Sequence, residues 1–474
     1  MTQSPKVSVC VATYNQGRYL SQALHSILGQ TLQDFEIIVS DDASTDDTPA
    51  IMAQVRDSRL RYVRQGRNMG IAENRNRCLV MARGQYIAWL DSDDIYHPAM
   101  LAVQSAVLDQ HPNVGLVHGA YEVIDSEGRR LPDWPLPFAQ DVIEPGKAAF
   151  RELVLSNYVN GTTVMVRRDC HERVGPYAAE LGKSSEDWEM WLRIALHADL
   201  AYTAAPIAQY RQHSSSSSVA TRHSGERLRC DIRAVRRLFR QQWALIPDAA
   251  AVQRQAAAAL AAKALIYAGD AYTLGQRLTA LTAALQGLRL FPALLGSQHS
   301  WLLLLSILCG DEYAHYQHSK AMLGQLYSQL SGARYGERIR KLALFNPEWE
   351  QVLQAIARTI QQVVPQDASI LIVDKYDPTL LHLSGRKGWH FPDRRLLPNV
   401  HPRNSELAIQ HLEQLRARGA AYLVFPSAAF WWLDYYTEFR QHLEFSAQRI
   451  WSDEQCIIYH LDAACQYFDP QSIK

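Results

Sequence analysis

Five aspartates follow directly on two short apolar segments in the first hundred residues. They are Asp41 and Asp42 after residues 35–40, and Asp91, Asp93 and Asp94 after residues 85–90. Carboxylates that converge on one place repel one another unless a cation is present. Hard oxygen ligands suit Mg²⁺ or Mn²⁺, which also take substrate phosphates as ligands. The spacing therefore predicts a metal–phosphate site. The alternative is a set of solvated turn and cap residues, which we prefer for Asp46 and Asp47.

A second acidic pair, Glu186 and Asp187, stands at the start of a predicted helix within residues 184–191. A carboxylate there can accept the proton of an attacking hydroxyl, which requires a base within about 2.6–3.2 Å of that oxygen. The same pair can complement the positive end of the helix dipole. The residue types alone leave both roles open.

The segments that carry these residues alternate between strand-like and helix-like patterns. Strands are predicted at residues 7–12, 35–40, 60–64, 85–90, 115–118 and 162–166, and helices between several of them, as at residues 74–82. Such alternation predicts an α/β domain over residues 1–222. In open α/β sheets, ligands bind beyond the carboxyl ends of the strands, which is where the aspartates fall.

The rest of the chain changes character twice. Residues 223–345 carry apolar residues at helical spacing in 256–268 and 278–290, so we expect a helical segment there. Residues 346–474 return to mixed strands and helices and predict a second, smaller α/β domain.

Composition excludes several classes of protein. Of the 474 residues, 47% are apolar and 20% charged, which is typical of globular domains. Because 48 basic residues balance 48 acidic ones, the net charge gives no electrostatic case for nucleic acid as the main partner. The seven cysteines form no CxxC pair, so we expect reduced, buried thiols.

Residues 1–15 lack a signal-peptide core, and the longest apolar run, 301–309, has half the length of a membrane span. We therefore expect a cytoplasmic protein.

Three ordered stretches carry a resemblance to a known family. They read VSVCVATYNQGRYLSQALHSILGQ, then FEIIVSDDASTDDT, then NMGIAENRNRCLVMARGQYIAWLDSDD. Together they resemble the family-2 glycosyltransferases over about residues 5–215. A lone DxD sequence occurs by chance, but a DxD at a strand end that follows a second acidic loop is specific. The resemblance implies a GT-A catalytic domain, which is Rossmann-like with a mostly parallel sheet.

The resemblance also implies roles for individual residues. It places the nucleotide pocket at Thr13, Tyr14, Asn15, Asp41, Asn68, Gly70, Arg75, Asp91 and Ser92. Within that set, Asp41 matches the carboxylate that binds the base, and Asp91 lies nearer the ribose. Asp93 matches the direct metal ligand of the family, and Asp91 is expected as a second metal ligand. Residues 73–77 read ENRNR where many relatives have AARN, so Arg75 is a weaker match.

Two further stretches match the family downstream. The Glu186–Asp187 pair resembles its acceptor-side acidic motif, which favours the base role for Asp187, with Glu186 second. Tyr210–His213 resembles a YRxHxxS stretch of relatives. There, His213 is either a third metal ligand or a contact to the diphosphate alongside Arg211. The serines at 214–218 suit either a loop over the donor or a linker.

The function expected from these features is inverting, metal-dependent glycosyl transfer. We expect Mn²⁺ or Mg²⁺ as cofactor, a nucleotide-sugar donor (first of all a UDP-sugar) and a hydroxyl of a bacterial surface glycan or protein glycan as acceptor. At most peripheral membrane contact is expected, and a homo-oligomer stays open. The alternatives are a polyprenyl-phosphate acceptor, or a catalytically silent glycan-binding or scaffold protein.

The domain at 346–474 resembles an accessory module appended to bacterial glycosyltransferases. Its aromatic residues could stack on sugars or form an aromatic core, and we prefer the core. They are Trp389, His390, Trp431, Trp432, Tyr435 and Tyr436.

Overall fold

The computed structural model describes most of the chain in two compact units. The described residues are 4–131, 136–182, 184–213, 216, 225–273, 276–293, 347–373, 379–392, 402 and 404–461. The first unit contains those up to residue 293, and the second those from residue 347.

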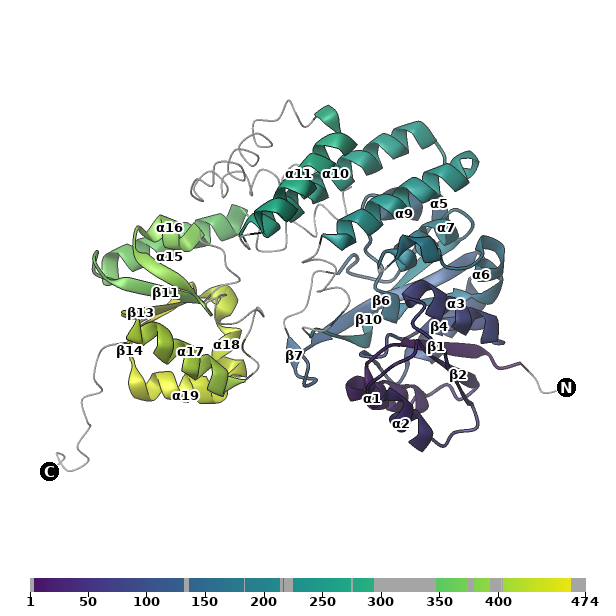
Figure 1. The fold of residues 1–474 in the computed structure, drawn as a ribbon, viewed down its shortest axis with the longest axis horizontal. Coiled ribbons are helices and arrows are strands. Elements are labelled where there is room, and N and C mark those ends of the chain that lie inside the picture. Colours follow the sequence, from purple (N-terminus) through teal and green to yellow (C-terminus); the bar gives the residue numbers. More distant parts are fainter. Residues whose placement is uncertain are drawn as a thin grey trace. The chain divides into compact units, whose positions relative to one another are not determined.

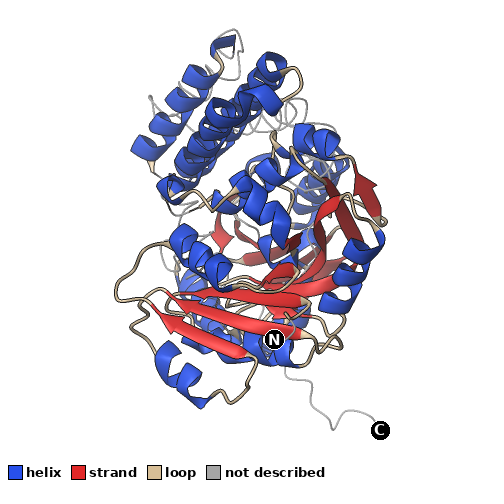
Figure 2. Ribbon diagram, turned by 90° about the vertical axis from the view of Figure 1, so that its right-hand side faces the viewer, coloured by secondary structure: helices blue, strands red, loops and turns tan. Residues whose placement is uncertain are grey.

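The first unit is built on one large sheet with helices on both faces (Figures 1 and 2). The strand order is β3-β2-β1-β4-β9-β6-β10-β5, with β7 paired to β6 and β8 to β10. Strands β3, β2, β1 and β4 run parallel, and β6 pairs parallel with β10. Because β9 is antiparallel to both β4 and β6, those two strands point the same way. The carboxyl ends of these six parallel strands therefore share one edge of the sheet.

The elements of this sheet domain have the following bounds. The strands are β1 Val7–Thr13, β2 Phe35–Asp41, β3 Leu60–Arg64, β4 Tyr86–Trp89, β5 Ile95–Tyr96, β6 Val114–Ile124, β7 Arg130–Leu131, β8 Val142–Glu144, β9 Met165–Arg167 and β10 Asp199–Arg211. The α-helices are α1 Gly17–Leu28, α2 Thr48–Gln54, α3 Ile71–Met81, α4 Met100–Gln110, α5 Gly146–Leu153, α6 Arg168–Val174 and α7 Glu186–Ala195. Short 3₁₀ turns lie at η1 Gly161–Thr163 and η2 Ala179–Leu181.

The core forms because the central strands are apolar on both faces. All seven residues of β1 and of β2 are buried, as expected for parallel strands covered on each side. Val7, Val9 and Val11 pack in one cluster with Leu20 and Leu24 of α1. The predicted α/β class with a mostly parallel sheet is confirmed.

The strands differ from the prediction in several places: β6 continues to Ile124, beyond the predicted residues 115–118, and β5, β7 and β8 have no predicted counterpart. The segment predicted as a strand at 162–166 begins as the turn η1 and becomes β9 only at Met165. The thirteen-residue strand β10 was not predicted. Its sequence, DLAYTAAPIAQYR, is poor in β-branched residues and contains a proline. It is a strand because β6, β8 and β5 supply its backbone partners.

Three helices continue the first unit: α9 Glu226–Gln242, α10 Ala249–Thr273 and α11 Arg277–Leu290, with a 3₁₀ turn η3 Trp243–Leu245 between the first two. Helix α9 contacts α7 and α10, and α10 contacts α11. Gly287 permits the α10–α11 approach, because a Cβ there would lie 2.9 Å from the carbonyl oxygen of Ala261. The predicted helical segment thus joins the sheet domain in one unit, while the apolar stretch 301–308 lies outside the described residues.

The second unit is a smaller α/β sheet of order β12-β11-β13-β15-β14. Its elements are α15 Pro347–Val363, β11 Ser369–Val373, α16 Thr379–Ser384, β12 Lys387–Phe391, α17 Ser405–Ala417, β13 Tyr422–Pro426, η5 Ser427–Ala429, α18 Trp431–Tyr435, α19 Thr437–Ser446, β14 Gln448–Ser452 and β15 Cys456–His460. Trp432 and Tyr436 are each 2% exposed and pack in one core cluster with Phe391 and Phe439. The core interpretation is confirmed for these two aromatics, whereas the side chain of Trp431 lies outside the described residues.

The structure also bears on the expectations about membrane-spanning helices and cysteines. No helix among the described residues is both long and apolar enough to span a membrane. The five cysteines within the described ranges are free and buried, as predicted, and Cys309 and Cys465 lie outside those ranges.

Candidate active site

The shared carboxyl edge of the sheet gathers most of the predicted site residues. Thr13 and Asp41 are the last residues of β1 and β2 and pair with each other in the sheet. Asp91–Asp94 follow β4, and His213 follows β10. The edge therefore brings together residues from four segments of the chain that lie far apart in sequence.

The loop after β1 is bound to the loop after β2. Asn15 has a left-handed backbone with φ of 53°. Its N–H donates to Ser44 Oγ at 2.9 Å, and its Oδ1 accepts from the backbone N–H of Thr45 at 2.7 Å. Tyr14 beside it is 46% exposed, so its ring is open to a ligand.

Asp42 holds the segment 68–70 against the end of β2. Its two carboxylate oxygens accept from the backbone N–H groups of Met69 at 2.7 Å and Gly70 at 2.8 Å. Gly70 has φ of 91°, a conformation that favours glycine. Asn68 lies exposed on this turn. The sequence pattern predicts Asp42 among the metal–phosphate carboxylates, but in the structure both of its carboxylate oxygens accept hydrogen bonds from backbone N–H groups.

Asp41 is fully buried and has partners within the chain. Its carboxylate accepts from Tyr62 Oη at 2.7 Å and from the backbone N–H of Ser44 at 2.8 Å, and Arg64 Nε lies at 3.5 Å. Burial and this carboxylate raise the pKa of Tyr62. Asp41 thus positions the loop that follows it; contact with a base stays a prediction.

The three aspartates after β4 have different environments. The side chain of Asp91 is 39% exposed, and that of Asp93 is 18% exposed with His213 Nε2 at 2.8 Å from its Oδ2. Asp94 is buried and accepts from the backbone N–H of Arg211 at 2.7 Å and from Thr162 Oγ1. Burial, Asp93 and Asp91 raise the pKa of Asp94 well above its usual range. Asp94 therefore anchors the turn, whereas Asp91 and Asp93 stay partly exposed.

Arg211, the last residue of β10, stabilises the same Asp91–Asp94 turn. It is 2% exposed, and its Nε donates to the carbonyl of Asp93 at 2.8 Å while its Nη2 donates to Gln22 Oε1 at 2.7 Å. Its Cζ lies 4.8 Å from the ring centroid of Tyr19. The guanidinium is thus engaged with the chain's own groups, which argues against the predicted contact of Arg211 to a diphosphate. His213 packs on the same Tyr19 ring, with centroids 4.8 Å apart.

Arg75 connects the two acidic motifs. Although it is 5% exposed, its Nη2 lies 3.0 Å from Asp91 Oδ1 and its Nη1 lies 3.4 Å from Glu186 Oε1. Its Cζ lies 5.6 Å from the ring centroid of Trp89 and 5.7 Å from that of Tyr177. The weaker sequence match at Arg75 thus falls on the residue that holds both sides of the site together.

Glu186 and Asp187 begin helix α7, but they differ in accessibility. Glu186 is 4% exposed, and burial together with neighbouring Asp187 raises its pKa to about 7, against the opposing effect of Arg75. Asp187 is half-buried, and its Oδ1 accepts from the backbone N–H of Trp188 at 2.6 Å. Asp187 is therefore the more accessible carboxylate of the pair.

The side-chain atoms available as metal ligands at this edge of the sheet suit a hard divalent cation. Asp93 and the exposed Asp91 offer carboxylate oxygens, and His213 offers an imidazole nitrogen beside Asp93. Within the described ranges, no point is surrounded by three or more His, Cys, Asp or Glu side chains in a metal-binding arrangement. Mg²⁺ typically takes one or two protein carboxylates and completes its shell with water and phosphate oxygens. The residues therefore fit a cation that binds together with a phosphate ligand.

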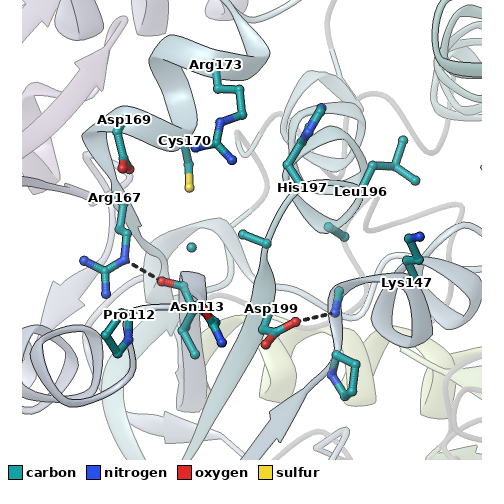
Figure 3. Close-up of a pocket in the computed structure, with 16 residues that line it drawn as sticks. Pro112, Asn113, Lys147, Arg167, Asp169, Cys170, Arg173, Leu196, His197 and Asp199 are labelled. Atoms are coloured by element: carbon teal, nitrogen blue, oxygen red, sulfur yellow. Dashed lines mark hydrogen bonds between the residues drawn. The ribbon is translucent and has the colours of Figure 1, made fainter. Parts of the chain in front are cut away.

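A pocket lies at the opposite edge of the sheet (Figure 3). It has a volume of about 570 Å³ and includes Asn113, which precedes β6, and Asp199, which begins β10. Lys147, Arg167 and Arg173 also line it, and Arg167 Nε donates to the carbonyl of Val114 at 2.7 Å. Because it lies at the amino ends of the parallel strands, this pocket is separate from the predicted site.

Comparisons with known proteins address the family. The model of "Glycosyl transferase family 2" matches residues 8–175, which include β1, β2 and the Asp91–Asp94 turn. "Putative glycosyltransferase EpsE" of Bacillus subtilis is 33% identical over 201 residues, covering 41% of this chain and 68% of EpsE. An uncharacterized glycosyltransferase of Rickettsia felis is 28% identical, with 45% of this chain and 35% of that protein covered.

Two further likenesses are more distant. The Escherichia coli protein named "UDP-Glc:alpha-D-GlcNAc-diphosphoundecaprenol beta-1,3-glucosyltransferase WfgD" is 26% identical over 215 residues, 45% of this chain and 79% of WfgD. Among solved structures, S. aureus TarS matches with a TM-score of 0.42 and 20% identity, over 71% of this chain and 54% of TarS. The motifs, the sheet and the relatives agree: the chain is an enzyme of glycosyl transferase family 2 with a GT-A catalytic domain.

Proposed function

We propose that this enzyme is a metal-dependent, inverting glycosyltransferase that moves a sugar from a UDP-sugar to a hydroxyl of a glycan. The observation that carries the proposal is the buried Arg75, which is ion-paired with both Asp91 and Glu186. One guanidinium thus holds Asp91, on the side expected to bind the nucleotide sugar, and Glu186, on the side expected to bind the acceptor. A sugar would be transferred between these two sides.

The chemistry follows from the accessible groups. Asp187 takes the proton of the acceptor hydroxyl as its oxygen bonds to the anomeric carbon. The bond from that carbon to the diphosphate breaks on the opposite face, and its electron pair leaves with the nucleoside diphosphate. One displacement of this kind inverts the anomeric centre and needs no covalent intermediate. Arg75 neutralises the flanking carboxylates, so that the approach of a negatively charged donor is less opposed.

A bound Mn²⁺ or Mg²⁺ would supply positive charge to the departing diphosphate. Asp93 and Asp91 would hold it, with His213 as ligand or as the partner that orients Asp93.

The donor and acceptor classes rest on different support. One relative, WfgD, is named as using UDP-Glc, which supports a UDP-sugar as the first donor to test. The same name places a lipid-linked diphosphate sugar as its acceptor, so a polyprenyl-diphosphate acceptor is the second candidate beside a free glycan.

The test is binding of UDP, GDP, dTDP and CMP with and without Mn²⁺, measured by thermal shift. A ligand at 100 times its dissociation constant stabilises the folded protein by about 2.7 kcal/mol, which a melting curve resolves. We expect UDP to raise the melting temperature only with metal. Asp93→Asn should abolish that shift. Asp187→Asn should keep it and lower transfer by about 10²-fold or more.

Asp47→Asn is the matched control, because Asp47 is an exposed aspartate after β2 whose side chain makes no cap hydrogen bond. It should behave as the wild type. Equal UDP binding with and without metal, or full transfer by Asp187→Asn, would contradict the proposal. Transfer to a polyprenyl-diphosphate sugar but to no free glycan would select the second acceptor class.

A further inference from the structure

A buried charged cluster lies beside the N-terminus of helix α7. It consists of Asp231 and Arg227 of α9 and Lys263 of α10, and we refer to it as the Asp231 brace. Asp231 is fully buried; Lys263 Nζ lies 2.6 Å from its Oδ2, and Arg227 Nε lies 3.6 Å from its Oδ1. Burial acts to raise the pKa of Asp231, but the two cations hold it below its usual range. The carboxylate is therefore charged at neutral pH.

The brace reaches α7 through the Ser185 hydroxyl and through Lys263, whose Nζ lies 5.8 Å from the ring centroid of Trp188. Ser185 Oγ donates to Asp231 Oδ1 at 2.6 Å. Ser185 is the N-cap residue of α7, and a serine there usually accepts a hydrogen bond from its own helix. Here the side chain makes no such cap bond, and the backbone is left-handed with φ of 69°. This conformation is uncommon for a residue with a Cβ, so it persists because tertiary contacts hold it.

The residues immediately after Ser185 are the acidic pair of the proposed mechanism. Glu186 and Asp187 form the first turn of α7, so the dihedral angles of Ser185 set the direction in which both carboxylates leave the backbone. Helix α9 also holds the flanks of this turn, because Arg237 pairs with Glu180 at 2.7 Å and with Glu189. Figure 1 shows α9 beside α7.

We propose that Asp231 is a positioning residue for the proposed base: through Ser185, the Asp231 brace fixes the orientation of Asp187. This inference rests on the proposed role of Asp187 and extends it to helices that follow the matched family region, which ends at residue 175. Burial acts to lower the pKa of Arg227, but Asp231 and, to a lesser extent, Tyr267, Asp187 and Glu186 raise it above its usual value, in agreement with the geometry.

The test uses Ser185→Ala, Asp231→Ala and the double variant in the full chain. Ser185→Ala removes the hydroxyl and leaves the Asp231–Lys263 ion pair intact. We expect each single variant to lower kcat by about tenfold or more, while the KM for the donor and the UDP-induced thermal shift stay within twofold of wild type. The double variant should be no slower than Asp231→Ala alone, because both substitutions remove the same Ser185–Asp231 hydrogen bond and only Asp231→Ala also removes the ion pairs to Lys263 and Arg227.

Hydrogen–deuterium exchange gives a readout that does not depend on activity. Amides of residues 184–189 should exchange about tenfold faster or more in both single variants, with unchanged exchange in the Asp91–Asp94 turn. Arg229→Gln is the control, since Arg229 is 48% exposed on the same helix and pairs only with Glu226 among the described ion pairs. It should leave exchange and kcat unchanged.

The outcomes separate the two proposals. Unchanged exchange at 184–189 would overturn the brace, whatever the activity. Faster exchange with wild-type kcat would overturn the positioning role. Parallel loss of kcat, UDP binding and melting temperature would show a merely structural role and overturn it too. A wild-type protein that binds no nucleotide and transfers no sugar would refute the proposed function, and the exchange experiment would still decide whether the brace holds α7.

Discussion

His118 should make the first unit sensitive to acid. This residue of β6 is 1% exposed, and its ring lies among those of Tyr202, Tyr158 and Phe138, with centroids 5.1, 5.7 and 6.4 Å away. Its Nε2 has no hydrogen-bond partner among the described residues. Burial lowers the pKa of His118 from 6.5 to about 3, because a charged imidazole would lose its hydration there.

The sign and size of the effect follow from that difference in pKa. Between pH 6.5 and 3 the unfolded chain binds a proton at His118 and the folded chain does not, so the free energy of unfolding falls as the pH falls. At pH 5, an imidazole of pKa 6.5 in the unfolded chain is about 97% protonated, which favours unfolding by about 2 kcal/mol relative to pH 7.5. This equals a change of about 30-fold in the unfolding equilibrium.

The assay is hydrogen–deuterium exchange of peptides from β6 at pH 7.5 and pH 5.0, with protection factors corrected for the intrinsic rates. The matched variant is His118→Phe, which keeps an aromatic ring among aromatic neighbours and removes the titrating group. Other groups also titrate in this range, so the informative quantity is the difference between the wild type and the variant. We expect the protection of β6 to fall about 30-fold further in the wild type.

An equal loss of protection in both proteins would refute the reasoning. It would mean that the folded state accommodates a protonated His118, through water or through a local opening that exposes the ring without unfolding the sheet. A greater loss in the variant would point to a packing defect, which its protection at pH 7.5 would reveal independently.

Three further predictions concern the charges of the first unit. Arg75→Met should lower the free energy of unfolding by about 1–3 kcal/mol, because buried Glu186 and partly exposed Asp91 lose their shared cation, and adding Glu186→Gln should restore part of it in thermal unfolding; no restoration would mean that the ion pair is not the cause. Arg193→Met should lower the free energy of unfolding by a similar amount, since Arg193 and its partner Glu189 are 4% and 0% exposed. The fraction of this variant that stays folded should bind UDP with wild-type affinity, measured by calorimetry at low temperature. Weakened binding would contradict a purely structural role. Treatment with EDTA should remove the UDP-induced rise in melting temperature, and either Mn²⁺ or Mg²⁺ should restore it; UDP stabilisation that survives EDTA would exclude a metal-linked donor site.

Much of the catalytic domain could be predicted from local sequence. Residues 7–13 and 35–41 are short, mostly apolar runs rich in β-branched residues, which favours strands buried on both faces, and each ends at a polar residue of the predicted site. The position of the Asp91–Asp94 turn follows from the same pattern. Strand β10 could not be predicted, because its residues have weak strand propensity and its partners supply the stability.

Periodicity and strand propensity are local properties, so they indicate which residue types stand at the strand ends. Which of these residues meet depends on long-range contacts in the folded chain. Asp94 binds the backbone 117 residues away at Arg211, and Ser185 binds Asp231 46 residues away. Arg75 is buried between two carboxylates that no spacing rule relates. Such contacts depend on which segments lie side by side in the folded protein and on how far burial removes water from their polar groups. Both are properties of the folded chain.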